Sequence, residues 1–165
     1  NCSGYETLES LRKLEGLIDV YLPDFKYIQP ETAQRYSHAA DYPNVVKTAI
    51  AEMVRQTGAC VFDAQGKIQK GVIVRHLLLP GKVREAKQIV QYLHETYGDR
   101  IYISLMNQYT PVAALENYPE LTRKVTRREY DRLVDYAISP GVENAFIQEG
   151  DTAKESFIPM FGDAL

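Results

Sequence analysis

The chain has 165 residues, of which 45% are hydrophobic and 25% are charged, and its formal net charge is -3. This composition fits one globular domain and excludes the basic surface of a nucleic-acid-binding protein, so we expect no nucleic acid partner. No apolar run approaches the roughly 20 residues that span a bilayer, so we expect no membrane contact. The low cysteine count favours a reducing, cytoplasmic location. The two cysteines, Cys2 and Cys60, are too few for a disulfide-stapled secreted scaffold.

The first residues, 1–4, have the composition of a turn, and we expect the chain to begin inside a longer protein. Continuous apolar runs predict strands that are covered on both faces, and a 3.6-residue apolar period predicts helices. The predicted elements in chain order are a strand at 17–22, a helix at 43–57, a turn or small hairpin at 63–67, a strand at 72–79, a helix at 83–97, a strand at 101–106 and a helix at 127–139.

Strands that alternate with helices of this length indicate βαβ units and a parallel sheet. Three such units bury little unless further strands complete the sheet, so the sequence predicts an α/β fold that is part of a parallel (βα) barrel. Residues 1–148 would form this partial barrel, and residues 149–165 a tail that is poorly ordered or docks through its aromatic side chains. The long polar connection at 107–126 is expected to carry function or contact a partner.

Polar residues follow the predicted strands, where the active sites of parallel α/β folds lie. Asp24 and Lys26 stand two residues apart, so both side chains point the same way and can hold a zwitterion or ribose hydroxyls; a solvated ion pair is the alternative. Arg75 and His76 point to opposite faces, and for His76 we favour a hydrogen-bonded core position over acid–base work. Gln108 offers an amide for a polar ligand, although such residues are also common in turns.

Several motifs of catalytic chemistry are missing from the sequence. It contains no glycine-rich phosphate loop, no HExxH motif and no cysteines with metal-ligand spacing. The three histidines lie far apart, and no serine stands in a nucleophile elbow. The sequence therefore lacks a complete catalytic set, and we expect the isolated chain to be inactive.

Three segments follow one another in a recognisable order. They are Tyr21-Leu-Pro-Asp-Phe-Lys-Tyr27, Val74-Arg-His-Leu-Leu-Leu-Pro-Gly81 and Tyr102-Ile-Ser-Leu-Met-Asn-Gln-Tyr-Thr-Pro111. Together they resemble the second half of radical S-adenosylmethionine proteins of the pyruvate formate-lyase activating enzyme type, in its activating-enzyme-like branch. The resemblance covers about residues 1–148.

The resemblance implies a partial barrel of six βα units, of which this chain carries roughly the last half. In that family a 4Fe-4S cluster on a Cys-x3-Cys-x2-Cys loop reductively cleaves S-adenosylmethionine to a 5′-deoxyadenosyl radical, which abstracts hydrogen from its target. The parent protein would be an oxidoreductase, with a glycyl-radical enzyme and an electron donor such as flavodoxin or ferredoxin as partners. The cysteine loop is absent from this chain, which is a second reason to expect inactivity.

Carried over by position, Asp24 and Lys26 match an Asp-x-Lys pair that helps to hold S-adenosylmethionine, and Arg75 matches a basic residue near it. His76 and Gln108 complete the expected cofactor-binding set, and Gln108 departs from the histidine that activases place there. If Asn1 ends the third strand of the barrel, it would also face this cofactor-binding end.

Two other functions stay open: a stand-alone α/β module that binds a nucleotide or peptide, and a truncated barrel enzyme that acts on a sugar or phosphate. In the parent protein, strand 17–22 should pair with a strand that ends just before Asn1. Without that neighbour, the uncovered edge predicts that the chain self-associates, or that residues 157–161 bury this edge.

Overall fold

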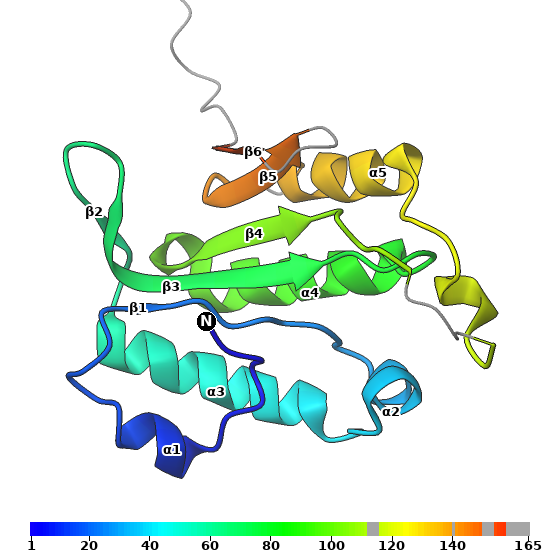
Figure 1. The fold of residues 1–165 in the computed structure, drawn as a ribbon. Coiled ribbons are helices and arrows are strands. Elements are labelled where there is room, and N and C mark those ends of the chain that lie inside the picture. Colours follow the sequence, from blue (N-terminus) through cyan, green and yellow to red (C-terminus); the bar gives the residue numbers. More distant parts are fainter. Residues whose placement is uncertain (112–115, 140, 150–153, 158–165) are drawn as a thin grey trace, which may run out of the picture.

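The structure is a computed structural model that describes residues 1–111, 116–139, 141–149 and 154–157. The described residues form a six-stranded sheet in the order β1-β3-β4-β5-β6, with β2 paired to β3 beside this path (Figure 1). The strands are β1 (Val20–Tyr21), β2 (Val61–Phe62), β3 (Ile68–Leu77), β4 (Tyr102–Met106), β5 (Ala145–Glu149) and β6 (Lys154–Phe157).

The sheet is mostly parallel. Strand β3 lies parallel to both β1 and β4, and β4 lies parallel to β5, whereas β6 is antiparallel to β5. Neighbouring parallel strands need a long crossover connection, which helices supply here. These crossover helices are α3 (Tyr42–Thr57), α4 (Val83–Tyr97) and α5 (Arg127–Ile138). The predicted α/β class with a parallel sheet is therefore confirmed.

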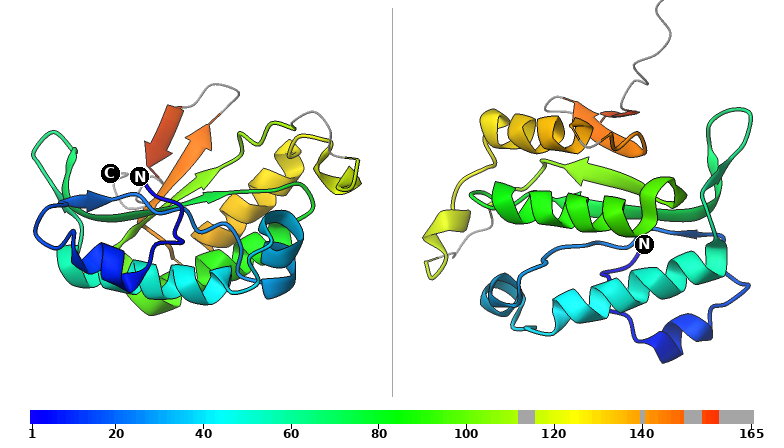
Figure 2. Two further views of the ribbon diagram at one scale, coloured as in Figure 1. Left: turned by 60° about the horizontal axis from the view of Figure 1, so that its bottom comes forward. Right: turned by 180° about the vertical axis from the view of Figure 1, so that it is seen from behind.

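The remaining helical segments are short. They are α1 (Leu8–Arg12), α2 (Pro30–Ser37) and the 3-10 turns η1 (Gly98–Arg100) and η2 (Pro119–Leu121). The left view of Figure 2 shows α3, α4 and α5 together on one side of the sheet. Among the described residues, every helix is too short or too polar to span a lipid bilayer.

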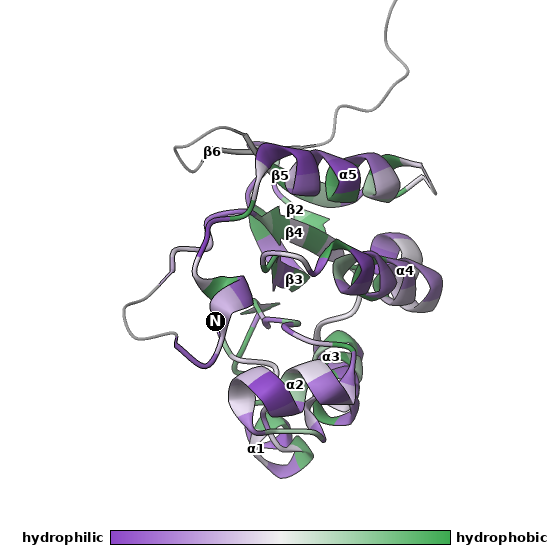
Figure 3. Cartoon of the chain, turned by 90° about the vertical axis from the view of Figure 1, so that its right-hand side faces the viewer, coloured by the Kyte–Doolittle hydropathy of each residue, from purple (hydrophilic) through white to green (hydrophobic). Residues whose placement is uncertain are grey.

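The core lies between these helices and the sheet. Along β3, Val72, Val74 and His76 are buried toward the helices, whereas the alternate residues are only half-buried. Figure 3 shows hydrophobic residues concentrated around β4, while α4 and α5 carry many hydrophilic residues. The side of the sheet that faces away from these helices is called the open face here. The strand register places on it the side chains of Leu22, Asp24, Ile73, Arg75, Leu77, Tyr102, Ser104, Met106 and Phe146.

The three predicted helices are confirmed, with a difference of one residue at the start of α3 and at the end of α5. The predicted turn at 63–67 is confirmed as the connection of the β2–β3 hairpin. The first strand is shorter than predicted, because Leu17 closes a turn on Leu14 and its side chain is 72% exposed. The parallel strand β5 was not predicted, since its apolar run covers only three residues.

The outer edge of β1 is partly occupied by the start of the chain. The backbone N–H of Cys2 donates to the carbonyl oxygen of Leu22 at 3.1 Å, and the backbone N–H of Asp24 donates to the carbonyl oxygen of Cys2 at 3.0 Å. Strand β6 pairs with β5 at the other end of the strand order, so the prediction that Phe157 covers the β1 edge is wrong. Residues 158–161 lie outside the described residues.

Candidate functional site

An ion pair between Asp24 and Arg75 stands on the open face, at the carboxyl ends of the parallel strands. Nε and Nη2 of Arg75 donate to Oδ1 of Asp24 at 2.9 and 2.6 Å. The backbone fixes this pairing, because the N–H of Arg75 donates to Pro23 and the N–H of Phe25 donates to Arg75, both at 2.8 Å. The side chains are 28% and 24% exposed, so a ligand can reach both.

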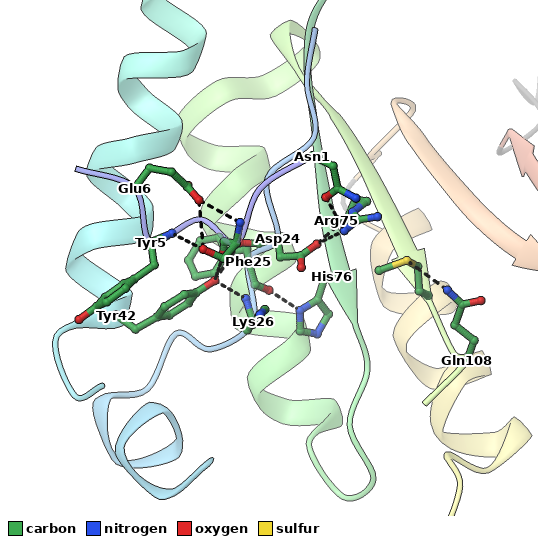
Figure 4. Close-up of polar contacts among 12 residues, drawn as sticks. Asn1, Tyr5, Glu6, Asp24, Phe25, Lys26, Tyr42, Arg75, His76 and Gln108 are labelled. Atoms are coloured by element: carbon green, nitrogen blue, oxygen red, sulfur yellow. Dashed lines mark hydrogen bonds and ion pairs between the residues drawn. The ribbon is translucent and has the colours of Figure 1, made fainter. Parts of the chain in front are cut away.

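Asn1 completes this polar group, which we call the Asp24–Arg75–Asn1 cluster (Figure 4). Nη2 of Arg75 also donates to Oδ1 of Asn1, at 2.8 Å. The second carboxylate oxygen of Asp24 has no hydrogen-bond partner among the described residues. The cluster therefore presents a guanidinium that is held in place and a carboxylate oxygen that can still accept a hydrogen bond.

The surroundings of the cluster on the open face are largely apolar. In sheet register, Arg75 neighbours Ser104, and Ser104 neighbours Phe146. The ring of Tyr102 contacts the rings of Phe62 and Phe146, with centroids 4.9 and 5.3 Å apart. A ligand that combines a charged group with a flat apolar group would match this arrangement.

Lys26 follows the ion pair in the chain, and its side chain is exposed. Its backbone N–H donates to the hydroxyl of Tyr42 at 3.0 Å, and this hydroxyl lies 2.8 Å from the carbonyl oxygen of Asp24. Burial raises the pKa of Tyr42, so the phenol stays protonated and keeps this contact. Tyr42, at the start of α3, thus supports the backbone that carries Asp24 and Lys26.

His76 lies on the other side of the sheet from the ion pair. Its side chain is 4% exposed, and Nδ1 lies 2.7 Å from the carbonyl oxygen of Phe25. Burial lowers the pKa of His76, which favours the neutral ring. The structure therefore places His76 behind the candidate site, in the hydrogen-bonded core position that we favoured from the sequence.

Gln108 lies beyond the end of β4, and Figure 4 shows it away from the Asp24–Arg75–Asn1 cluster. Its Nε2 is 3.9 Å from the sulfur of Met106. Since Ser104 pairs with Arg75, residue 108 extends past the carboxyl end of the sheet, the same edge to which Lys26 belongs. Asp24, Arg75 and Asn1 are thus in contact, whereas Gln108 belongs to the same edge but stands apart.

The two cysteines are separate half-buried thiols. Burial raises the pKa of Cys2 to about 11 and also raises the pKa of Cys60. Both thiols are therefore protonated near neutral pH, which makes them poor metal ligands. Within the described ranges, no group of three or more His, Cys, Asp or Glu side chains is arranged to hold a metal ion.

The described part of the long connection 107–126 packs on α2. Nε of Arg35 donates to Glu120 at 2.7 Å, and the hydroxyl of Tyr36 donates to the same carboxylate at 2.9 Å. The guanidinium of Arg35 lies 5.3 Å from the ring centroid of Tyr118. Hydrogen bonding to Arg35 lowers the pKa of Glu120 to about 2, so this contact between the two segments is ionic.

Sequence reasoning missed two residues that support the candidate site. Gly4 has φ +78°, and a Cβ there would lie 2.3 Å from the carbonyl oxygen of Asp24. The glycine in the opening turn was visible in the sequence, but its approach to Asp24 was not. Tyr42 gave no signal at all, because nothing in a helix-starting tyrosine indicates a contact with residues 24–26.

No protein-family model matches the chain. The chain is 27% identical, over 137 residues, to the uncharacterized protein MJ0674 of Methanocaldococcus jannaschii. The match covers 83% of this chain and 36% of that protein. The chain thus spans about a third of the length of the curated relative that it matches.

Proposed function

We propose that the chain forms the ligand-supporting part of a radical S-adenosylmethionine enzyme of the activating-enzyme type. The observation that carries this proposal is the Asp24–Arg75–Asn1 cluster at the carboxyl ends of parallel strands, where ligands bind in α/β folds. In this proposal the sheet is part of a partial barrel, and the open face lines its interior. Asp24, Lys26 and Arg75 then contact S-adenosylmethionine.

The residues present fit such a ligand. Arg75 and Lys26 supply donors for the carboxylate of its methionine part, and the second oxygen of Asp24 accepts from its ammonium or from ribose hydroxyls. The half-buried apolar side chains of the open face suit its purine. When bound, S-adenosylmethionine supplies the adenosyl group that this class of enzyme uses for hydrogen abstraction.

The residues of this chain do not fit a 4Fe-4S cluster. Cluster ligation needs several thiolates held together, whereas Cys2 and Cys60 are separate protonated thiols. The ligands of a 4Fe-4S cluster would therefore belong to residues outside this chain. We accordingly expect no 5′-deoxyadenosine when the chain is treated with iron and sulfide under nitrogen and given reductant and S-adenosylmethionine.

Equilibrium dialysis with S-adenosylmethionine tests the proposed site directly. We expect saturable binding that is weakened about tenfold or more by Lys26→Ala and by Arg75→Gln, since each removes a charge-assisted hydrogen bond. The matched controls are Lys67→Ala, in the turn of the β2–β3 hairpin, and Arg123→Gln, which replaces an arginine that pairs with Glu129. Lys26 is exposed, so its replacement should leave the free energy of unfolding unchanged.

A sugar phosphate and a nucleotide serve as competing ligands in the same experiment. Binding of a sugar phosphate without binding of S-adenosylmethionine would favour the truncated sugar- or phosphate-processing enzyme. Equal affinities for S-adenosylmethionine in the Lys26, Arg75 and control variants would remove both residues from the site.

A further inference from the structure

His76 is held between the candidate site and the helix layer. Its Nδ1 lies 2.7 Å from the carbonyl oxygen of Phe25, the residue between Asp24 and Lys26. A carbonyl oxygen only accepts hydrogen bonds, so Nδ1 carries the ring proton. In the neutral ring, Nε2 then presents a lone pair and needs a donor.

This second nitrogen of His76 is buried and has no hydrogen-bond partner among the described residues. A buried acceptor without a donor is costly, and native proteins satisfy such atoms with protein groups or with ordered water. The ring borders a small cavity of about 10 Å³ between α2, α4 and the segment after β1. Its other lining residues are Lys26, Tyr27, Thr32, Leu79, Lys82, Glu85 and Ala86.

Size and charge together select the occupant of this cavity. A volume of roughly 10–15 Å³ accommodates a single water molecule. The lining contains two basic residues, Lys26 and Lys82, and one acidic residue, Glu85, so its mixed charge selects neither a cation nor an anion. A water molecule suits both sides, because it donates to the acceptors and accepts from the donors. The Thr32 hydroxyl, 3.5 Å from Nζ of Lys82, is a further polar partner in the cavity wall.

We propose that this cavity binds one ordered water molecule, which donates a hydrogen bond to Nε2 of His76 and bridges it to the hydroxyl of Thr32. The water completes a chain of hydrogen bonds from the first turn of α2, through the imidazole, to the carbonyl of Phe25. It thereby supports the backbone of residues 24–26 from behind the sheet. Lys26 is the one lining residue that the cavity shares with the proposed ligand site, and neither His76 nor Thr32 belongs to that site.

Nuclear magnetic resonance of the uniformly ¹⁵N-labelled full chain tests the proposal. A long-range ¹H–¹⁵N spectrum should show His76 with a proton on Nδ1 and none on Nε2. A water-selective NOE experiment should show a cross-peak between water and Hδ2 or Hε1, the two ring protons that flank Nε2. A proton on Nε2, or the absence of the water cross-peak at both ring protons, would overturn the proposal.

The variant Thr32→Val removes the hydroxyl while keeping the side-chain shape, and we expect it to abolish the water cross-peak. Thr57→Val is the matched control, because Thr57 is a buried helical threonine whose hydroxyl donates to the carbonyl of Met53 instead. A cross-peak that persists in Thr32→Val, or that disappears equally in Thr57→Val, would overturn the bridge. If Thr32→Val does not fold, the spectrum of the unmodified chain decides the question.

Discussion

Replacing Gly4 by alanine should test how tightly the opening turn supports the candidate site. Gly4 has φ +78°, and a Cβ would lie 2.3 Å from the carbonyl oxygen of Asp24 and 2.7 Å from Cγ2 of Val46. Contacts this short force atoms to move. Hydrogen bonds to Tyr42 and Cys2 hold the backbone around the carbonyl of Asp24, so a displacement of this carbonyl would weaken those bonds.

The expected loss has two parts. Alanine in the left-handed region costs about 1–2 kcal/mol relative to its preferred conformations. Overpacking against the carbonyl oxygen of Asp24 and the Val46 side chain adds about 1–3 kcal/mol. We therefore expect Gly4→Ala to lower the free energy of unfolding by about 2–5 kcal/mol. That is a large share of the roughly 5–15 kcal/mol that stabilises a typical domain.

Gly16 provides a matched control for this prediction. Its φ is +79°, nearly that of Gly4, but a Cβ there would meet nothing within 4 Å. Gly16→Ala should therefore cost only the conformational part, about 1–2 kcal/mol. Urea unfolding followed by circular dichroism measures both variants. Equal losses would refute the claim that the opening turn is packed directly against Asp24.

Two further predictions concern capping and pH. Glu129→Ala should lower the free energy of unfolding in urea by about 1–2 kcal/mol, because Glu129 closes the capping box of α5 and accepts from the N–H of Gly81. Asp131→Ala, at an exposed position of the same helix, is the control, and equal losses in the two variants would count against this role of Glu129. The free energy of unfolding should fall as the pH drops below about 6.5, because burial lowers the pKa of His76 and only the unfolded state gains its proton. His76→Phe should flatten that slope, and an unchanged slope would exclude His76 as its source.

The sequence predicted the crossover helices well because their own residues decide them. Helix α4 has an apolar stripe with a 3.6-residue period and Gly98 directly after its last residue, so its limits at Val83–Tyr97 follow from local chemistry. Strand β1 was harder, because only pairing with β3 defines its two residues. Strand β5 has a short apolar run, and it forms because β4 offers an edge beside it.

The candidate site was only partly predictable for the same reason. The shared direction of the strands correctly predicted that Asp24 and Arg75 lie at one edge of the sheet. The alternation of side chains along β3 correctly predicted that His76 lies on the opposite face from Arg75. Gln108 departs from the expected group, since its position depends on the path of the connection after β4 rather than on strand geometry. Residues that act through backbone contacts, such as Gly4 and Tyr42, leave no recognisable pattern in a single sequence.

The open face also predicts how the isolated chain behaves in solution. Among the described residues, no helix covers the half-buried side chains of this face (Figure 2). An apolar sheet face that no helix covers favours association in water. The β1 edge contributes less than its sequence suggested, because Cys2 already pairs with Leu22 and Asp24. We therefore expect self-association through the open face rather than through residues 17–22.

Sedimentation velocity over a concentration series tests this expectation. Ile73 lies at the centre of the open face and is half-buried, so Ile73→Lys should shift the chain toward monomer by placing a charge in the interface. Leu17, 72% exposed in the turn before β1, provides the comparison, and Leu17→Lys should leave association nearly unchanged. Urea unfolding of both variants verifies that they are folded. A chain that is monomeric at every concentration would contradict the prediction, and association that only Leu17→Lys relieves would locate the contact at the β1 side instead.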